Sequence, residues 1–422
     1  MTPPTGKVVP RPVQTQVKHT ILEQYLKSWG GIILNGLRGI ATQKRINTEF
    51  VYVDGFASVG RYDGETSDAV AAHPGPTVWG SPIIGVHTVD MLERMADNYH
   101  IGFKATYILI EENRLAHSEL LKSLERAGLS SRIKLNPLLS SLRAGDIAVF
   151  NADARQMSND LVGYTQRRYC KAFYFLDPWG CKGIPLTFVG QIVKQEGHDA
   201  MIYMPYNDLL RRTGSVDKIE LSQTEEALLK NYDAMFGNGS WRQIGSDIER
   251  AQQNEQKYDS KEIDLVNCYK ESLMSVDPRL IVKSIHLRFE DVDRTLYHLY
   301  LTTHNVDGAL AMNSVLYKAG YQEYVLRWKF EDAKLAGERG QLSMFEPHEL
   351  VDSKSRPSIE SIARHIQKNH GGQSVELQQV CVALVESTYF RDEIATAIRK
   401  LRSEGLVTYT GALKNTAKIT FK

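Results

Sequence analysis

Residues 50–60, FVYVDGFASVG, decide the fold class of this chain. An apolar run ends in Asp54, and a short loop of small residues then closes with a second glycine. In an α/β sheet, ligands bind where strands end, because backbone N–H groups converge there. We therefore expect Gly55 and Gly60 to let the backbone approach a ligand, while the Asp54 carboxylate accepts hydrogen bonds from an amine or a hydroxyl. A buried strand followed by an ordinary glycine turn would give the same pattern.

Four further apolar runs follow this one and alternate with segments of helical spacing. They lie at residues 105–110, 146–150, 171–176 and 198–204. Strands that alternate with helices in this way are typical of a doubly wound, mostly parallel sheet. We therefore expect an α/β fold of the Rossmann type, with residues 49–53 as its first strand.

The segment before the first strand is predicted to be a helix. Apolar residues recur at helical spacing over residues 18–33, and the glycines at 30 and 31 favour a break in the middle. Core packing is the simplest role for the aromatic residues on this face. Lys18 and His19 lie near the start of the helix, where they could line a site.

A second helix is predicted to begin only after a long loop rich in Gly, Asp, Pro and Ser. Ser81 suits its N-cap and Pro82 its first helical position. A free helix N-terminus beside the glycine loop favours an anionic group such as a carboxylate. A third helix is expected from Asn113 to about Gly128.

Acidic residues follow four of the five predicted strands within a few positions. They are Asp54, Glu111 or Glu112, Asp153 and Asp177. Because the carboxyl ends of parallel strands meet at one edge of a sheet, we expect these side chains to gather there. An acid after the second strand can accept hydrogen bonds from both hydroxyls of a ribose, and Asp153 lies where an adenine amino group could be read. Each acid alone would more often be a solvated loop residue.

The chain changes character after the fifth strand. Residues 206–279 are polar with helical spacing and are predicted to form a helical insertion or a cap over the site. Residues 280–289 and 295–302 then predict an antiparallel hairpin. Two helices and a linker follow, at residues 305–319, 321–336 and 337–357.

The C-terminal stretch, residues 358–422, is predicted to be a separate winged-helix domain. Three short helices and two strands occur in that order, at residues 359–369, 375–387, 391–403, 406–410 and 418–421. From Arg356 onward, ten Lys and Arg stand against six Asp and Glu, on a chain whose net charge is only +1. The third helix enters the groove in DNA-binding versions, so nucleic acid is an expected partner, contacted by Arg399, Lys400, Arg402 and Lys414. A winged helix that binds protein, or that simply packs, is the alternative.

The bulk composition is that of an ordinary soluble protein. The chain has 422 residues, 42% hydrophobic and 24% charged, which favours two or three domains. Residues 1–17 are rich in Pro, Thr and Gln; we expect a disordered tail and find no apolar core of the signal-peptide kind. No apolar run approaches the roughly 20 residues of a membrane span, so a cytoplasmic location is expected. The four cysteines lack CxxC spacing, so no metal site and no disulfide framework is predicted.

Several motifs together resemble those of the three-Cys-motif partner proteins. They are Lys18-His-x-Ile-Leu-x-x-Tyr-Leu-x-x-Trp29, Val53-Asp-Gly-Phe-Ala57 with Gly60, Gly80-Ser-Pro82, Leu176-Asp-Pro-Trp-Gly180, and the hairpin and helix from Leu301 to Tyr317. The resemblance covers roughly residues 18–330. It implies a domain over residues 18–336 that is similar to the class I S-adenosylmethionine (SAM) methyltransferases, with seven strands of which the last pair brings in an antiparallel one. It also implies a cysteine-rich partner protein.

The same resemblance implies roles for the site residues. The loop of Asp54, Gly55, Phe56, Ala57 and Gly60, with Ser81 beyond it, would hold the methionine part of SAM. Glu111 or Glu112 would hold the ribose, and Asp153 would read the adenine. Asp177, Pro178 and Trp179 resemble the Asp-Pro-Pro-aromatic motif of enzymes that methylate exocyclic amines of bases. There the acid and the proline carbonyl accept hydrogen bonds from the target amine, and the aromatic ring stacks on the base.

Two departures from the family pattern bear on these roles. The loop lacks the full GxGxG pattern, and the aromatic residue of Asp177-Pro-Trp-Gly180 has moved by one position. Cys181 could be a nucleophile for carbon methylation, although a small loop residue is the simpler account. Two other functions stay open: a non-catalytic accessory module that recruits its cysteine-rich partner to nucleic acid, or a methyltransferase that acts on a protein or a small molecule.

Overall fold

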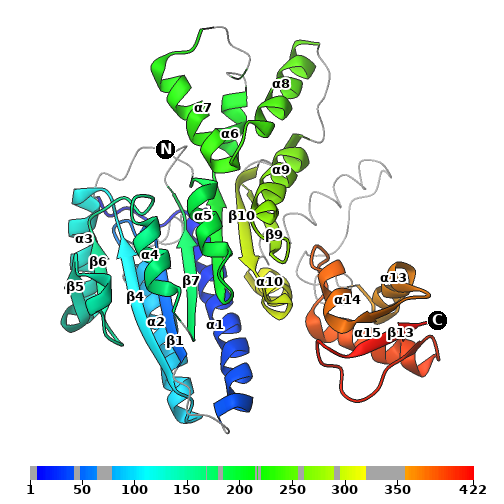
Figure 1. The fold of residues 1–422 in the computed structure, drawn as a ribbon. Coiled ribbons are helices and arrows are strands. Elements are labelled where there is room, and N and C mark those ends of the chain that lie inside the picture. The colour runs from blue at the N-terminus through cyan, green and yellow to red at the C-terminus, as the bar shows by residue number, and fades with distance from the viewer. Residues whose placement is uncertain are drawn as a thin grey trace, which may run out of the picture. The chain divides into compact units, whose positions relative to one another are not determined.

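The protein forms two compact units, residues 1–304 and 305–422. The computed structural model describes residues 7–41, 48–63, 78–167, 169–178, 184–213, 216, 220–254, 261–288, 295–319 and 357–422. The first unit is an α/β structure with one large sheet, and the second combines helices with a small sheet (Figure 1). Within the described ranges, no helix combines the length and the apolar character needed to cross a membrane.

The large sheet has eight strands in the order β5-β6-β4-β1-β7-β8-β10-β9. Their bounds are β1 Thr48–Asp54, β4 Phe103–Ile110, β5 Ile133–Leu135, β6 Ile147–Phe150, β7 Cys170–Leu176, β8 His198–Met204, β9 Ile281–Arg288 and β10 Thr295–Thr303. Strand β1 is central and pairs in parallel with β4 and β7. Strand β10 runs antiparallel to both β8 and β9. The expected Rossmann-like, mostly parallel sheet is therefore present.

The expectation of seven strands is wrong by one. The additional strand, β5, pairs in parallel with β6 at the edge of the sheet. It has only three residues, Ile-Lys-Leu, and two of them are exposed. Three residues are too few to show a continuous or alternating apolar pattern, so no strand was predicted there.

Helices cover both faces of the large sheet (Figure 1). Helices α1 (Val13–Ala41) and α2 (Ser81–Asn98) pack on one face, whereas α4 (Ser158–Thr165) and α5 (Leu186–Val193) pack on the other. The side chains of β1 alternate between these layers, as a strand requires. Phe50 meets Trp29 of α1 edge-on, with ring centroids 4.9 Å apart, while Val51 and Val53 belong to the core under α4 and α5.

Helix α1 is longer and more regular than predicted. It starts at Val13, inside the stretch expected to be a disordered tail, and runs for 29 residues without the break expected at the two glycines. Gly30 faces α2, where a Cβ would stand 2.2 Å from a methyl carbon of the buried Leu92. This glycine therefore serves close helix packing instead of a break.

The starts of α2 and α3 follow the expected chemistry with a small shift. Gly80 is the N-cap of α2, so Ser81 is its first helical residue, one position from the predicted cap. Helix α3 (Arg114–Arg126) begins as predicted, because the Asn113 side chain accepts hydrogen bonds from the N–H groups of Leu115 and Ala116 at 2.9 and 3.0 Å.

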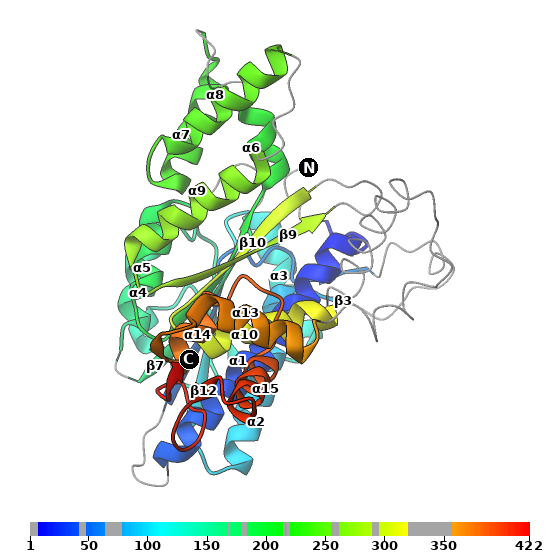
Figure 2. The ribbon, with the colours of Figure 1, turned by 90° about the vertical axis from the view of Figure 1, so that its right-hand side faces the viewer.

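The predicted insertion is helical, as expected. It consists of α6 (Tyr206–Thr213), α7 (Gln223–Phe236), α8 (Ser240–Gln253) and α9 (Lys261–Val276). Figures 1 and 2 show α7 and α8 extending beyond the sheet, with α9 alongside the predicted hairpin of β9 and β10. The turn of that hairpin, residues 289–294, lies outside the described residues.

The second unit contains the three predicted helices and the predicted strand pair. Its elements are α10 (Val306–Ala319), α13 (Ile359–His370), β11 (Ser374–Glu376), α14 (Leu377–Ala383), α15 (Arg391–Ser403), β12 (Val407–Thr408) and β13 (Lys418–Phe421). The middle helix is shorter than expected, because β11 replaces its start and pairs with β13. Helix α10 packs against α14 and α15. The helix expected over residues 321–336, and the linker up to residue 356, lie outside the described residues.

The glycine pair in α1 offers a matched test of its packing. Gly30→Ala places a methyl group against Leu92 and should lower the free energy of unfolding by about 1–3 kcal/mol. Gly31→Ala meets no atom within 4 Å and should be neutral or stabilising by up to about 1 kcal/mol. Urea unfolding followed by circular dichroism measures both, and equal effects of the two variants would contradict the role given to Gly30.

Candidate functional site

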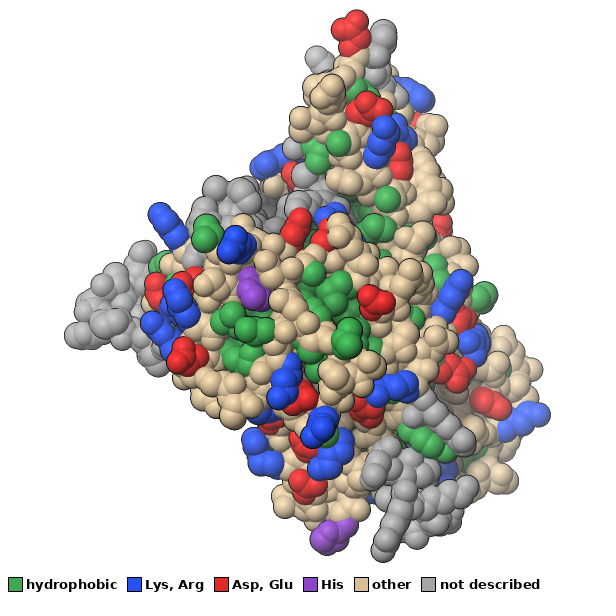
Figure 3. Space-filling view, turned by 60° about the vertical axis from the view of Figure 1, so that its left-hand side comes forward, with side chains coloured by type: hydrophobic (Ala, Val, Ile, Leu, Met, Phe, Trp, Pro, Cys, Tyr) green, Lys and Arg blue, Asp and Glu red, His purple; other side chains and the backbone are tan. Residues whose placement is uncertain are grey.

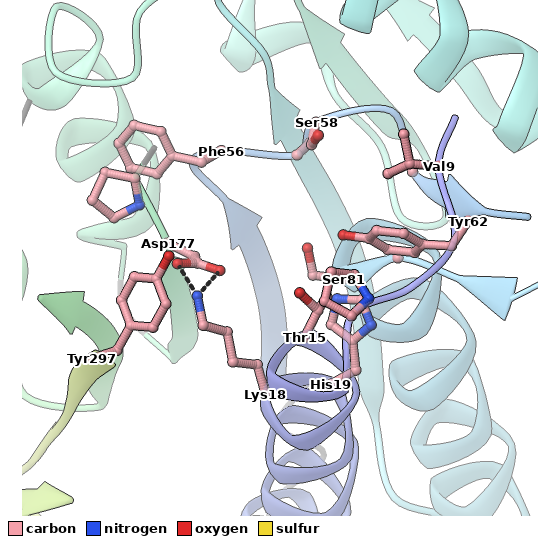
Figure 4. Close-up of a pocket in the computed structure, with 15 residues that line it drawn as sticks. Val9, Thr15, Lys18, His19, Phe56, Ser58, Tyr62, Ser81, Asp177 and Tyr297 are labelled. Atoms are coloured by element: carbon pink, nitrogen blue, oxygen red, sulfur yellow. Dashed lines mark hydrogen bonds and ion pairs between the residues drawn. The ribbon is translucent and has the colours of Figure 1, made fainter. Parts of the chain in front are cut away.

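A pocket lies at the carboxyl ends of β1 and β7 (Figure 4). Its cavity volume is about 160 Å³. The lining residues come from the N-terminal segment and α1, the loop after β1, the start of α2, the end of β7 and β10: Val9, Pro12, Thr15, Lys18, His19, Phe56, Ala57, Ser58, Gly60, Tyr62, Gly80, Ser81, Asp177, Pro178 and Tyr297. Among the residues that the structure describes, none from α6 to α9 lines the pocket, so the expected cap does not contribute to its wall.

Backbone hydrogen bonds to β4, β7 and the start of α2 fix the glycine loop after β1. The Gly55 N–H donates to the Phe175 carbonyl of β7 at 3.0 Å, and the Ala57 N–H donates to the Ile110 carbonyl of β4 at 2.8 Å. Gly60 has a positive φ of 74° and accepts a hydrogen bond from the Gly80 N–H at 2.8 Å. The loop is therefore a preformed backbone cradle.

The two glycines of this loop do not both face a ligand. A Cβ on Gly55 would stand 2.9 Å from a Leu176 methyl carbon, and a Cβ on Gly60 would stand 2.8 Å from a Leu120 methyl carbon. Gly60 lines the pocket, whereas Gly55 packs beneath it. These glycines therefore permit close packing against core side chains, Leu176 at Gly55 and Leu120 at Gly60.

Asp54 lies fully buried beneath the pocket. Burial raises the pKa of its carboxyl to about 7, although hydrogen bonds from the Ser81 side chain and the Phe56 N–H oppose that shift. The charge of Asp177 raises the pKa further. Asp54 therefore supports the loop and the start of α2, and it titrates near neutral pH.

An ion pair crosses the pocket between α1 and the end of β7. The Lys18 ammonium donates to both carboxylate oxygens of Asp177, at 2.8 and 2.9 Å. It also lies over the rings of Tyr297 and Tyr203, at 3.7 and 4.5 Å from their centroids. The Lys18 side chain is 7% exposed and the Asp177 side chain 25%. Each ring contact with a desolvated cation is worth roughly 0.5–2 kcal/mol, so this ammonium is held from several sides.

His19 brings an unpartnered polar atom to the pocket. Its ring packs at 5.6 Å from that of Tyr62, and its Nδ1 is buried with no hydrogen-bond partner among the described residues. Burial, with smaller contributions from the charges of Arg11 and Lys18, lowers the pKa of His19 to about 3. The imidazole is therefore neutral, and its Nδ1 is a buried polar atom without a hydrogen-bond partner beside the pocket.

The structure gathers only some of the predicted cofactor residues. Phe56, Ala57, Gly60 and Ser81 line the pocket, and Asp54 and Gly55 support it from below. Glu111, Glu112 and Asp153 do not line it. Both carboxylate oxygens of Glu111 accept backbone hydrogen bonds, from Ser58 at 2.8 Å and from Asn113 at 2.7 Å. Asp153 pairs with Arg155 at 2.6 Å.

The motif after β7 is described in part. Asp177 and Pro178 line the pocket. Trp179 and Cys181 lie outside the described residues. Phe175, in the strand that carries the motif, pairs with Asp54 in the register of β1 and β7, which explains why the two carboxyl groups come close.

Several lining residues were missed by the sequence analysis. Val9, Pro12 and Thr15 belong to the stretch expected to be disordered, and Tyr62 and Tyr297 were given no role. The Val9 carbonyl accepts a hydrogen bond from the Asp63 N–H at 3.1 Å, which holds this segment beside the pocket. One signal was present: Thr15, Lys18 and His19 are spaced i, i+3 and i+4, which places them on one helical face.

The residues predicted to bind nucleic acid lie in the second unit. Arg399, Lys400 and Arg402 are on α15, and Lys414 lies between β12 and β13. Arg399, Arg402 and Lys414 are exposed. Lys400 pairs with Glu360 at 3.3 Å and with Glu404 at 3.2 Å, which reduces the positive charge that it offers to a ligand.

Fold and pocket together define a Rossmann-like α/β protein with a binding pocket at the carboxyl edge of its sheet. No known family model matches the chain, and neither does any curated protein. Similar solved structures include protein LPL1258 from Legionella pneumophila, of family DUF519, with a TM-score of 0.33 and 9% identity over 68% of this chain and 85% of that chain. Another is YjhP from E. coli, with a TM-score of 0.20 and 11% identity over 64% of this chain and 91% of that chain. TM-scores this low carry no argument about function.

The buried Asp54 predicts a pH dependence of stability. A carboxyl titrates near ~4 in an unfolded chain, so the folded state binds this proton more tightly and loses stability as the pH rises from about 4 to 7. Asp54→Asn imitates the neutral acid and should reduce that loss by up to about 4 kcal/mol. Urea unfolding between about pH 4 and pH 8 measures the effect.

Asp199 provides a control for this measurement. Burial also raises the pKa of its carboxyl to about 7, but it lies near the start of β8, away from the pocket, and accepts a hydrogen bond from the Trp29 indole. Asp199→Asn keeps an oxygen that can accept the Trp29 indole N–H, so it should flatten the pH profile without changing ligand binding, whereas Asp54→Asn should change both. An Asp54→Asn variant with the wild-type pH profile would show that Asp54 is charged throughout.

Proposed function

We propose that this protein binds SAM in the pocket and transfers its methyl group to an amine nitrogen. One observation carries the proposal: the loop after β1, the start of α2 and the Asp177-Pro178 segment after β7 meet at one pocket. The position of β10, antiparallel within the last strand pair, agrees with the sheet of the class I methyltransferases that the sequence resembles.

The methionine end of SAM fits the residues of the pocket. Helix α2 has no acidic residue in its first turn, so its N-terminus favours a carboxylate. The neutral His19 lines the same pocket, and its unpartnered Nδ1 would bond the amino or the carboxylate group only after the ring turns toward the ligand. The glycine loop would support the same end of the ligand through its backbone.

The ribose and adenine ends fit less well in the present arrangement. Glu111 already accepts hydrogen bonds from the loop and from the start of α3, and Asp153 already pairs with Arg155. Binding of the nucleoside would therefore require these carboxylates to exchange partners. The pocket therefore supports binding of the methionine end of SAM more directly than binding of the nucleoside.

SAM supplies a methyl group on a positively charged sulfur, which is a very good leaving group. The acceptor nitrogen must be neutral when it forms the new bond to carbon, while the electron pair of the broken carbon–sulfur bond stays on sulfur. Asp177 can orient the acceptor N–H and receive the proton that the nitrogen loses. Catalysis would then rest mainly on positioning.

The second unit would bring nucleic acid to the protein. In our proposal α13, α14 and α15 form a winged helix with the three-stranded sheet, and three of the four candidate cations are exposed. The face drawn in Figure 3 mixes positive and negative side chains, whereas nucleic-acid binding needs a concentrated positive surface. In our proposal the exposed Arg399, Arg402 and Lys414 of the second unit make the contacts to nucleic acid.

A non-catalytic role is the second candidate. It is favoured by the Lys18–Asp177 pair, because this ammonium already occupies the carboxylate that would orient an acceptor. The protein would then serve as an accessory module for the cysteine-rich partner that the sequence resemblance implies. Binding of SAM without methyl transfer would support this alternative.

Isothermal titration calorimetry tests the cofactor assignment. We expect saturable binding of SAM to the whole protein. Thr15 is half-buried and lines the pocket, so Thr15→Trp should fill it and weaken binding at least tenfold, about 1.4 kcal/mol. Gln24→Trp, at a half-buried position of α1 outside the pocket, should leave binding unchanged. No heat of binding, or equal weakening by both variants, would reject the assignment.

Salt-dependent binding tests the nucleic-acid role of the second unit. Each phosphate contact contributes about 0.9 to the slope of log K against log salt. Replacement of Arg399, Arg402 and Lys414 by alanine should therefore lower the slope by up to about 3. Lys400→Ala should change it less, because Lys400 is paired with two glutamates. A slope that is unchanged in the triple variant would contradict this role.

A further inference from the structure

We propose that the acceptor subsite beside Asp177 takes a primary alkylammonium group, and that the Lys18 ammonium occupies this subsite in the free protein. The inference rests on the proposed function and names its substrate class: an aliphatic amine or a lysine side chain, instead of the amine of a base. In the free protein, the Lys18 ammonium thus occupies the position that the ammonium group of the substrate would take.

The walls of the subsite are suited to a full positive charge. The Asp177 carboxylate holds the Lys18 ammonium with two hydrogen bonds of 2.8 and 2.9 Å. The faces of Tyr297 and Tyr203 lie 3.7 and 4.5 Å from the nitrogen. An acid combined with two aromatic faces is how proteins recognise alkylammonium ions.

The amine of a base would use these walls poorly. An exocyclic amine on a heteroaromatic ring carries no charge at neutral pH, so it gains no cation–π attraction from Tyr203 or Tyr297. It would also leave the Asp177 carboxylate without a countercharge in a partly buried place. An alkylammonium satisfies the rings and the carboxylate together, and the proton that it must lose before its nitrogen bonds to the methyl carbon would pass to water.

The Lys18 side chain also reaches the subsite from a separate element. It extends from α1 toward Asp177, and Tyr297 approaches from β10 (Figure 4). An ion pair between Lys18 and Asp177 would be enough to hold α1 against the end of β7, without any aromatic contact. The two rings add a preference for a cation, and the pocket beside Asp177 gives a second amine a route to the same carboxylate.

Chemical complementation tests the inference. Lys18→Ala removes the atoms that propylammonium would restore. Calorimetry on the full chain should show propylammonium binding to this variant, at least tenfold more weakly after Asp177→Asn is added, and no binding to the wild-type protein. Lys18→Ser leaves a similar space and replaces the alanine variant if that one does not fold.

Two controls decide whether the subsite selects charge. The neutral 1-propanol should bind Lys18→Ala at least tenfold more weakly than propylammonium does. Lys18→Met keeps the apolar stem and should exclude propylammonium. Equal binding of alcohol and amine, or propylammonium affinity that does not depend on Asp177, would overturn the inference and leave a simple apolar cavity.

Further measurements identify the source of the amine and separate the two proposals. If the substrate is a protein, a peptide with one internal lysine should bind Lys18→Ala more tightly than propylammonium does. Tighter binding of propylammonium than of the peptide would point to a small amine. Either result supports the subsite. SAM binding without any ammonium binding overturns the inference alone. Ammonium binding without SAM binding supports the subsite and rejects the cofactor assignment.

Discussion

Helix α1 is held against the sheet by Trp29, and the pocket depends on that contact. The Trp29 ring meets Phe50 and Phe173 edge-on, with centroids 4.9 and 5.8 Å away, and its indole N–H donates to the buried Asp199. Lys18 lies about three helical turns earlier, some 16 Å along the axis. Because an α-helix is rigid over that length, the anchor at Trp29 sets the position from which Lys18 reaches the site.

Charge balance in the pocket follows from this placement. Asp54 is the last residue of β1, and Asp177 follows β7, the neighbouring strand. Within the described residues, the Lys18 ammonium is the only one that is hydrogen-bonded to either carboxylate. A buried carboxylate and a partly buried one that share a single cation would be costly. The raised pKa of Asp54, to about 7, relieves that cost, since the neutral acid leaves a balanced pair above it. The same arrangement explains why Asp54 supports the site from below while Asp177 faces the cavity.

The sequence predicted those parts of the fold that local chemistry determines. The apolar run before Asp54, the Asn113 cap and the alternating strands were found because burial and capping act over a few residues. Strand β5 was missed, since its three residues carry no pattern. The break expected near Gly30 was wrong because the partner that explains this glycine, Leu92, is distant in the sequence.

The site was harder to predict, because its walls come from distant segments of the chain. The acids at the strand ends were identified, but periodicity could not show that Glu111 would bind its own backbone while Asp177 would face the cavity. The segment from Val9 to Thr15, which forms one wall, has the composition of a tail. Its placement has a practical consequence: a purification tag or a protease cut within this segment would alter the pocket itself, so fusions are better joined at the carboxyl terminus.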